Sequence, residues 1–179
     1  ITNEKTHTKT IIFHPSIMPG IVICDPALVT GLPPHLTAAT GMDALTHNVE
    51  SYIAKGYHPM CDGIALEGVR IAARALPVAV REPGNLEARS DMLMASMMGA
   101  VAFQKDLGAT HSCAHALSTV ADLHHGLANG IMIDYVMRFN QSAEVARFAI
   151  MAEAAGVARG SAEASASAFV DWLTGLKRE

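Results

Sequence analysis

Asp43, His47, His111 and His125 are the residues whose types and spacing best suit metal binding. Asp43 and His47 lie four positions apart, so a helix would place both side chains on one face. The stretch from His111 to His125 contains four of the nine histidines, and Gly126 follows His125 directly. One carboxylate and three imidazoles suit a borderline divalent metal such as Fe(II) or Zn(II). The sequence therefore predicts a metal site, and with it an enzyme.

Each part of this set also has a simpler interpretation. An aspartate and a histidine four residues apart are often a surface or capping pair, and a lone helical histidine is usually a core or surface residue. His111 and His115 repeat the four-residue spacing, which strengthens the metal interpretation. Glu50 shares the face of Asp43 and His47. It is either a carboxylate that hydrogen-bonds a ligating imidazole or a solvated glutamate.

The composition favours close helix packing and excludes several classes of protein. Half of the 179 residues are hydrophobic, 17% are charged and only 5% are aromatic. A net charge of −4, without a stripe of lysine and arginine, argues against a nucleic-acid partner. No apolar stretch reaches the roughly 18–20 residues of a membrane span, so we expect no membrane partner. The three cysteines form no C-x-x-C pair, and a reducing cytoplasm is the expected location.

The elements that must position these residues are mostly helices. Residues 1–25 read as extended chain, with β-branched runs at Thr10–Phe13 and Gly20–Cys24. The apolar period after the Pro33-Pro34 pair predicts a first helix that ends near Lys55. Further helices are expected at Pro59–Leu76, Leu86–Phe103, Thr110–Leu123, Leu127–Phe139, Ser142–Val157 and Ser161–Leu173. Pro77 should end the second helix, and Ser142 and Ser161 should cap the last two.

Several other catalytic patterns are missing from the 179 residues. The sequence contains no H-E-x-x-H, no G-x-S-x-G, no G-x-x-x-x-G-K and no G-x-G-x-x-G after a strand. The histidines and Asp43 therefore remain the main candidates for chemistry.

Two long stretches carry a resemblance to a known family. Residues 25–54 read DPALVTGLPPHLTAATGMDALTHNVESYIA, and residues 102–133 read AFQKDLGATHSCAHALSTVADLHHGLANGIMI. Both resemble the motifs of the iron-dependent (group III) alcohol dehydrogenases, in the order that the family has them. Two long motifs in the correct order are far more specific than one short pattern.

The resemblance implies a role for individual residues. The family's metal ligands fall on the four residues that spacing had selected. His115 falls on a histidine near the nicotinamide that is implicated in proton relay. Lys9 matches a lysine near the cofactor phosphates or ribose, and Phe103 matches an aromatic position near the nicotinamide. The implied cofactors are Fe(II), with Zn(II) as the alternative, and NAD or NADP.

The resemblance also implies a fold and a division of the chain. We expect a mainly α protein, in which residues 31–179 form a helical metal-binding domain. Residues 1–30 would be a short β-hairpin-like remnant of the family's α/β nucleotide-binding domain. That domain's Gly-Gly-Gly-Ser phosphate loop and Thr-Thr motif do not occur here, so we expect a chain that is truncated at both ends.

The function implied is NAD(P)-dependent, metal-dependent interconversion of a small alcohol and its aldehyde or ketone, in a homo-oligomer. Two alternatives stay open at this point. A hydrolase could use a metal-bound water without a nicotinamide, and a catalytically silent helical module could merely bind metal. Nicotinamide binding distinguishes the dehydrogenase from both.

Overall fold

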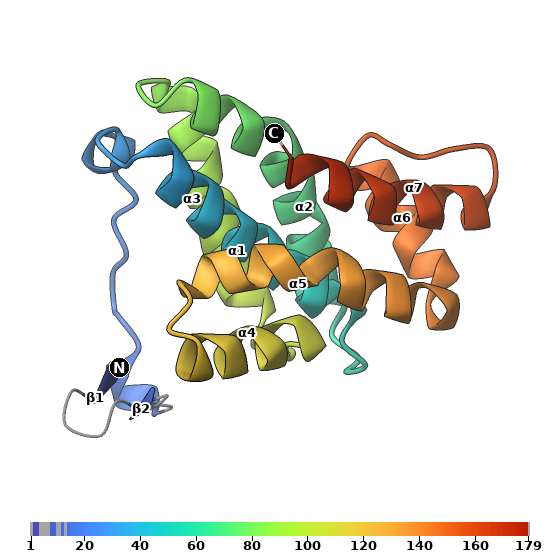
Figure 1. Ribbon diagram of the computed structural model, residues 1–179, viewed down its shortest axis with the longest axis horizontal. Helices are drawn as coiled ribbons and strands as arrows, with labels where there is room; N and C mark the ends of the chain where they lie inside the picture. The colour runs from blue at the N-terminus through green and yellow to red at the C-terminus, as the bar shows by residue number, and fades with distance from the viewer. Residues whose placement is uncertain (1, 4–7, 10–11, 13, 179) are drawn as a thin grey trace.

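The structure is a computed structural model that describes residues 2–3, 8–9, 12 and 14–178. Seven α-helices make up most of these residues (Figure 1). The helices are α1 Pro34–Ile53, α2 Pro59–Arg81, α3 Leu86–Ala102, α4 Ala109–Val120, α5 His125–Asn140, α6 Val145–Ala154 and α7 Ala162–Leu176. Short 3-10 helices lie at Pro15–Ile17, Pro26–Val29 and Gln141–Ala143. The prediction of a mainly α protein is confirmed.

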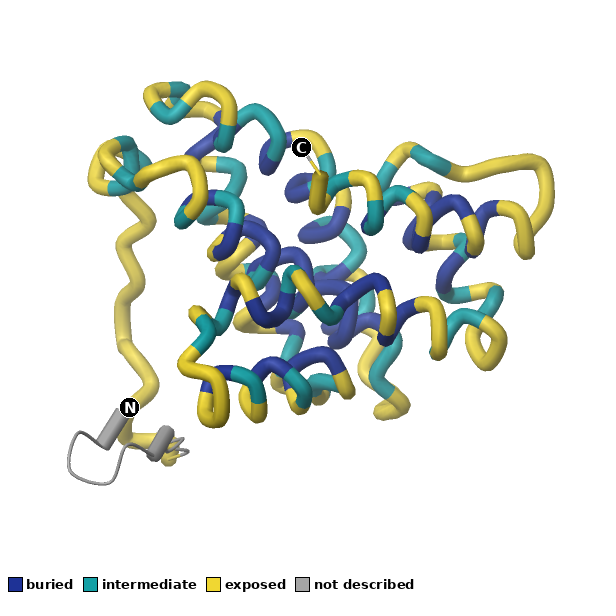
Figure 2. Tube along the Cα trace, viewed as in Figure 1, coloured by how far each residue is buried: buried dark blue, intermediate teal, exposed yellow. Residues whose placement is uncertain are grey.

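Helix α1 lies at the centre of the helical assembly. It packs against α2, α3 and α5, and Leu45 and Val49 on it are fully buried (Figure 2). A helix that is covered on most of its sides belongs to a protein core. Several polar side chains on α1, among them Asn48 and Glu50, are therefore removed from water and need partners within the protein. Asp43 and His47 lie on the same helix and are half-buried.

Two glycines allow neighbouring helices to come close to α1 near these residues. A Cβ atom at Gly99 would lie 2.8 Å from Cβ of His47. A Cβ atom at Gly126 would lie 2.3 Å from the backbone oxygen of Ala39. Only glycine fits at such distances, so α3 and the start of α5 approach α1 almost backbone to backbone. Gly126 directly follows His125, which places that histidine beside α1.

The second helix does not end at Leu76, as the sequence predicted. Helix α2 continues through Pro77 to Arg81. A proline inside a helix removes one backbone hydrogen bond and costs about 3 kcal/mol. Burial of Leu76 and Ala79 on either side of the proline opposes this cost. Tertiary packing therefore overrides the local preference against a helix.

Several other helix boundaries differ from the prediction by up to three residues, whereas the predicted cap at Ser161 is confirmed. Helix α4 ends at Val120 rather than Leu123, and Asp122 adopts a left-handed backbone with φ of 52°. Ser142 does not cap α6, because it lies in the preceding 3-10 helix. Ser161 does cap α7, and its Oγ accepts a hydrogen bond from the backbone N–H of Ala164 at 3.2 Å.

The N-terminal part contains a short hairpin and an extended link. Strands β1 (Thr2–Asn3) and β2 (Thr8–Lys9) pair in an antiparallel manner. Residues 20–24 are exposed and form no strand, because no neighbouring strand among the described residues pairs with them. The run Thr10–Phe13 falls largely outside the described residues. The division of the chain near residue 30 stays a prediction.

Candidate metal centre

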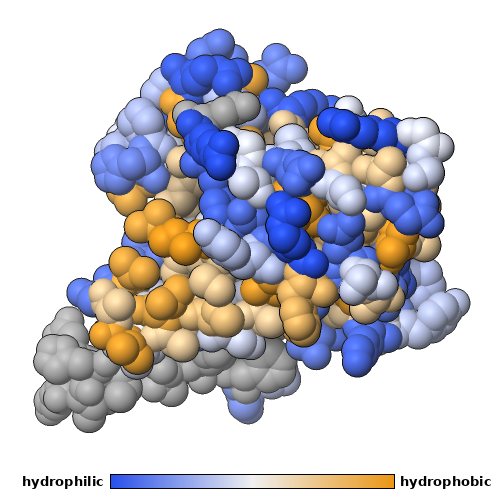
Figure 3. Space-filling model, turned by 45° about the vertical axis from the view of Figure 1, so that its right-hand side comes forward, coloured by the Kyte–Doolittle hydropathy of each residue, from blue (hydrophilic) through white to orange (hydrophobic). Residues whose placement is uncertain are grey.

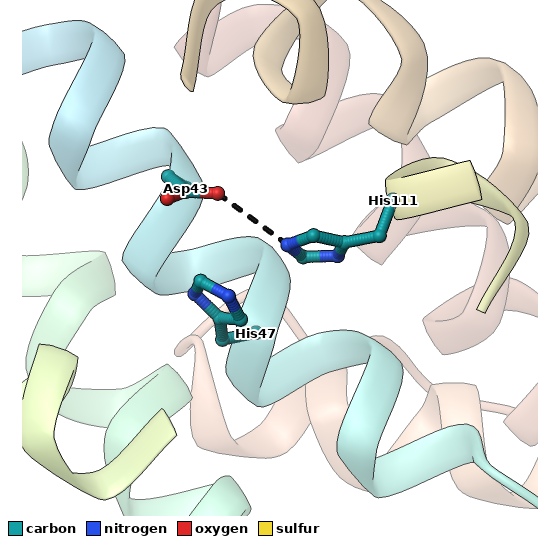
Figure 4. A group of neighbouring side chains, drawn as sticks. All are labelled: Asp43, His47 and His111. Carbon is teal, nitrogen blue, oxygen red and sulfur yellow. Dashed lines mark ion pairs between the residues drawn. The ribbon is translucent and has the colours of Figure 1, made fainter. Parts of the chain in front are cut away.

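Three of the four predicted ligands converge at the contact between α1 and α4. Asp43 and His47 extend from successive turns of α1, and His111 extends from the first turn of α4 (Figure 4). Each residue offers a ligand atom, and the three atoms all lie within 4.8 Å of one another. One carboxylate oxygen and two imidazole nitrogens at this spacing can share a single metal ion.

His125, the fourth predicted ligand, lies beside this group without being part of it. Its Nε2 is 3.5 Å from Oδ1 of Asp43, and its ring centroid is 5.5 Å from that of His111. His125 is the first residue of α5, where the helix crosses α1. It therefore stands within reach of the same carboxylate oxygen as His111.

Asn129 joins Asp43 to His125, and sequence reasoning did not select it. Its side-chain Nδ2 donates to Oδ1 of Asp43 at 2.6 Å and lies 3.1 Å from Nε2 of His125. Asn129 is fully buried on α5, one turn after His125. The four-residue spacing from His125 was the available signal, but the contact with Asp43 depends on how α5 crosses α1.

Glu50 sets the orientation of the His111 ring. Nδ1 of His111 lies 2.8 Å from Oε2 of Glu50, and an ionised carboxylate only accepts hydrogen bonds. Nδ1 therefore carries a proton. Nε2 of His111 is buried without a hydrogen-bond partner, and the nearest carboxylate oxygen is Oδ1 of Asp43 at 3.4 Å. A buried nitrogen with this orientation is what a metal-binding histidine requires, so the residues present fit a metal.

The charges around the centre favour a positive charge within it. Burial alone would raise the pKa of Asp43, but His111, His47 and His125 together hold that pKa below its ordinary value. Burial alone would lower the pKa of His111. The Asp43 and Glu50 carboxylates that face the ring raise this pKa to about 9. A proton on His111 balances these carboxylates in the metal-free protein. A divalent cation would replace that proton.

His47 and Glu50 are also in the ionisation states that a metal centre needs. Burial, followed by the charges of the neighbouring histidines, lowers the pKa of His47, although Asp43 opposes the shift. Burial would raise the pKa of Glu50, but hydrogen bonds from His111 and Thr110 lower it. His47 is therefore neutral and able to bind a metal, whereas Glu50 is a carboxylate near neutral pH.

The remaining predicted site residues lie around this centre at different distances. His115 is exposed, with its ring centroid 4.9 Å from that of His125. The ring of Phe103 lies 5.3 Å from that of His47. Lys9 lies in β2, but its side chain is outside the described part of the structure. The roles of these residues, and of the four ligands, stay predictions.

A cavity lies beside Phe103, whose ring is 5.3 Å from that of His47. It has a volume of about 480 Å³ and lies between the N-terminal link and the end of α3. Its lining residues are Ile12, His14, Pro15, Ile17, Met18, Phe103 and Gln104. Apart from His14 and Gln104 they are apolar, which suits a flat organic ring more than a phosphate.

Comparisons with known proteins identify the family of the chain. Residues 37–179 match the C-terminal part of the Fe-containing alcohol dehydrogenase family. The 1,3-propanediol dehydrogenase of Citrobacter freundii is 43% identical over 157 residues, which cover 87% of this chain and 41% of that protein. The NAD-dependent methanol dehydrogenase of Bacillus methanolicus is 39% identical, with the same coverage.

A solved structure extends the likeness to the fold. Sulfoacetaldehyde reductase from Bifidobacterium kashiwanohense, in complex with NAD⁺, is 34% identical and has a TM-score of 0.85. The match covers 98% of this chain and 46% of that one. The chain spans about two fifths of the length of the curated relatives that it matches. From the family match and these relatives, the chain belongs to the iron-containing alcohol dehydrogenase family.

Proposed function

We propose that the protein containing this chain is a metal-dependent, NAD(P)-linked dehydrogenase. It would interconvert a small alcohol and its aldehyde or ketone. The observation that carries the proposal is that ligand atoms of Asp43, His47 and His111 all lie within 4.8 Å of one another. The names of the relatives, which include a propanediol and a methanol dehydrogenase, support the class of reaction.

Asp43, His47, His111 and His125 would hold the metal, with Fe(II) as the expected ion and Zn(II) as the alternative. A divalent metal held there would supply Lewis-acid stabilisation of the alcohol oxygen, and a nicotinamide would supply the hydride acceptor. Asn129 holds Oδ1 of Asp43, and Glu50 keeps Nε2 of His111 directed toward the other ligands.

The residues around the ligands have separate proposed tasks. His115 is exposed beside His125, so it would carry the proton of the alcohol between the centre and water. Phe103 would form one wall of the nicotinamide pocket, because it lines the apolar cavity and its ring lies 5.3 Å from that of His47. Lys9 would contact the phosphates or ribose of the cofactor.

The remaining features of the proposal concern the setting of the enzyme. We propose a cytoplasmic homo-oligomer that acts on small molecules and has neither a nucleic-acid nor a membrane partner. None of the described helices has the length and hydrophobicity that crossing a bilayer requires. Analytical ultracentrifugation at several concentrations tests the oligomer, and a single species with the mass of one chain would contradict it.

The decisive assay uses the full-length product of the gene that encodes this chain. Metal-depleted protein is supplied with Fe(II) or Zn(II) and with NAD or NADP, and absorbance at 340 nm is followed with methanol, 1,3-propanediol and longer alcohols. We expect nicotinamide reduction that requires the added metal and falls at least 100-fold in His125→Ala. Full activity is expected in His124→Ala, which changes the exposed neighbour of His125.

Two outcomes would contradict the proposal. Undiminished alcohol oxidation by metal-free protein would remove the metal from the reaction. Failure of NADH and NADPH to bind, measured by nicotinamide fluorescence, would leave the hydrolase or the silent metal-binding module as the better explanation.

A further inference from the structure

Glu50 is a buried carboxylate that the proposed reaction does not itself use. Glu50 is only 1% exposed, and its side chain lies on the face of α1 that carries Asp43 and His47. A buried carboxylate is costly unless several donors surround it. The hydrogen-bond partners of Glu50 therefore indicate its structural role.

Four donors meet the two oxygens of Glu50, and all come from the start of α4 and its cap. Oε1 accepts from the backbone N–H of Thr110 at 2.7 Å. Oε2 accepts from the backbone N–H of Gly108 at 3.1 Å and of His111 at 3.1 Å. Oε2 also accepts from Nδ1 of His111 at 2.8 Å. One side chain thus satisfies three N–H groups that a helix start leaves unpaired, and it holds the imidazole.

Helix α4 has few other ties to α1. It packs chiefly against α5 and makes little direct contact with α1. Asp43 and His47 are fixed by α1, whereas His111 is fixed by α4. The position of His111 relative to the other ligands therefore depends strongly on the bonds that Glu50 makes between the two helices.

Gly108 shows how closely the cap of α4 fits around Glu50. A Cβ atom at Gly108 would lie 2.7 Å from Oε1 of Glu50, which is closer than real Cβ contacts. Any larger residue at position 108 would push the carboxylate out of place. The close fit between the cap of α4 and Glu50 therefore depends on the absence of a side chain at Gly108 as well as on the carboxylate of Glu50.

We propose that Glu50 is a positioning residue of the metal centre. It docks the N-terminus of α4 onto α1 and keeps the proton of His111 on Nδ1, so that Nε2 faces Asp43 and His47. The inference rests on the proposed metal centre for its purpose. The docking of α4 by Glu50 can be measured without any metal.

The first test measures metal affinity. Glu50→Gln keeps the shape of the side chain, but its amide group must face at least one of the four donors. We expect Zn(II) affinity, measured by competition with a chromophoric chelator, to fall about 10–100-fold. Glu153→Gln, an exposed glutamate on α6, is the matched control and should bind Zn(II) as the unchanged protein does.

The second test reads the site directly. At saturating Co(II), the visible d–d absorption of Glu50→Gln should differ from that of the unchanged protein, because His111 is no longer held in one orientation. A merely stabilising role for Glu50 would leave this spectrum unaltered in folded protein. Equal Zn(II) affinity together with an equal Co(II) spectrum in Glu50→Gln would overturn the proposal.

The third test needs no metal and separates the two proposals. In metal-free protein, we expect the backbone N–H groups of Gly108, Thr110 and His111 to exchange with solvent at least 10-fold faster in Glu50→Gln. Unchanged exchange at these amides would show that Glu50 does not dock α4. If the unchanged protein binds no Zn(II) but these amides behave as expected, the metal centre fails and the docking stands.

A second variant covers the case in which Glu50→Gln does not fold. Gly108→Ala leaves Glu50 in the sequence but places a methyl group against Oε1. It should weaken Zn(II) binding and speed exchange at Thr110 and His111 in the same direction. Wild-type values for both quantities in a folded Gly108→Ala protein would contradict the proposal.

Discussion

At the residue scale, the centre combines two carboxylates with several imidazoles, and hydrogen bonds limit the orientation of Asp43 and His111. Asn129 holds Asp43, and Glu50 holds His111. Residue types and spacing in the sequence predicted Asp43, His47, His111 and His125 as neighbours, and the structure groups the first three and places His125 beside them. Spacing in the sequence could not predict the role of Asn129, because Asn129 contacts Asp43, which lies 86 positions away in the chain.

Removing the amide of Asn129 should weaken the centre without removing a ligand. In Asn129→Ala, Oδ1 of Asp43 loses the donor that lies 2.6 Å away, so the carboxylate gains freedom to rotate. We expect Zn(II) affinity to fall about 10-fold, measured by chelator competition. Asn140→Ala, at the far end of α5, is the control. Equal affinities in both variants would show that Asn129 does not orient Asp43.

The raised pKa of His111 predicts a pH dependence of the metal-free protein. The folded pKa is about 9, against 6.5 for an ordinary histidine, so the protonated ring stabilises the fold. This contribution is complete below about pH 6.5 and is lost as the pH rises through about 9. Urea unfolding between pH 6 and 10 should show a decline that is much smaller in His111→Gln. Parallel curves for both proteins would contradict the pKa.

At the element scale, the sequence predicted the helices well and their ends less well. Apolar periodicity located α1 and α3 to within about two residues. The prediction for α2 stopped at Leu76, because local rules count the cost of Pro77 but not the packing that opposes it. The sequence also could not predict the hydrogen bonds that hold the α3–α4 connection, because these bonds join residues that are distant in sequence.

Lys105 holds the α3–α4 connection, which lies between Phe103 and His111. Its Nζ donates to Oδ1 of Asp62 at 2.7 Å and to the backbone oxygen of Tyr52 at 3.1 Å, and its side chain is 1% exposed. Arg147 also pairs with Asp62 at 3.1 Å. Asp62 therefore keeps one cationic partner when Lys105 is removed.

We expect Lys105→Met to lower the free energy of unfolding by about 1–3 kcal/mol, because Asp62 and the carbonyl of Tyr52 lose a buried donor. Urea unfolding measures this difference. Lys55→Met is the control, since Lys55 is exposed at the surface. A loss in Lys105→Met no greater than in the control would show that the connection is held by other contacts.

At the scale of the whole molecule, the core is centred on α1, and parts of the surface remain apolar. Figure 3 shows hydrophobic residues gathered on the lower half of the face that it draws. Leu127, Ile131, Tyr135 and Phe139 form an exposed stripe at four-residue spacing along α5. Composition predicted a helical core, but it could not predict which helix would be central, because that depends on how all seven pack.

Metal binding should stabilise the whole fold, because the ligands come from helices that are distant in sequence. A ligand that binds only the folded state at 100 times its Kd adds about 2.7 kcal/mol. We expect excess Zn(II) to raise the Tm of metal-depleted protein by several degrees, measured by circular dichroism. Asp43→Asn should show little or no rise, whereas a full rise in that variant would place the stabilising metal elsewhere.

The central claim is that one metal ion lies between α1, α4 and α5. Anomalous X-ray diffraction from crystals grown with Zn(II), measured on both sides of the zinc absorption edge, tests it most directly. We expect one strong peak per chain, within about 2.0–2.3 Å of an oxygen of Asp43 and of nitrogens of His47, His111 and His125. A peak bound by other residues, or none at this place in zinc-saturated protein, would contradict the claim.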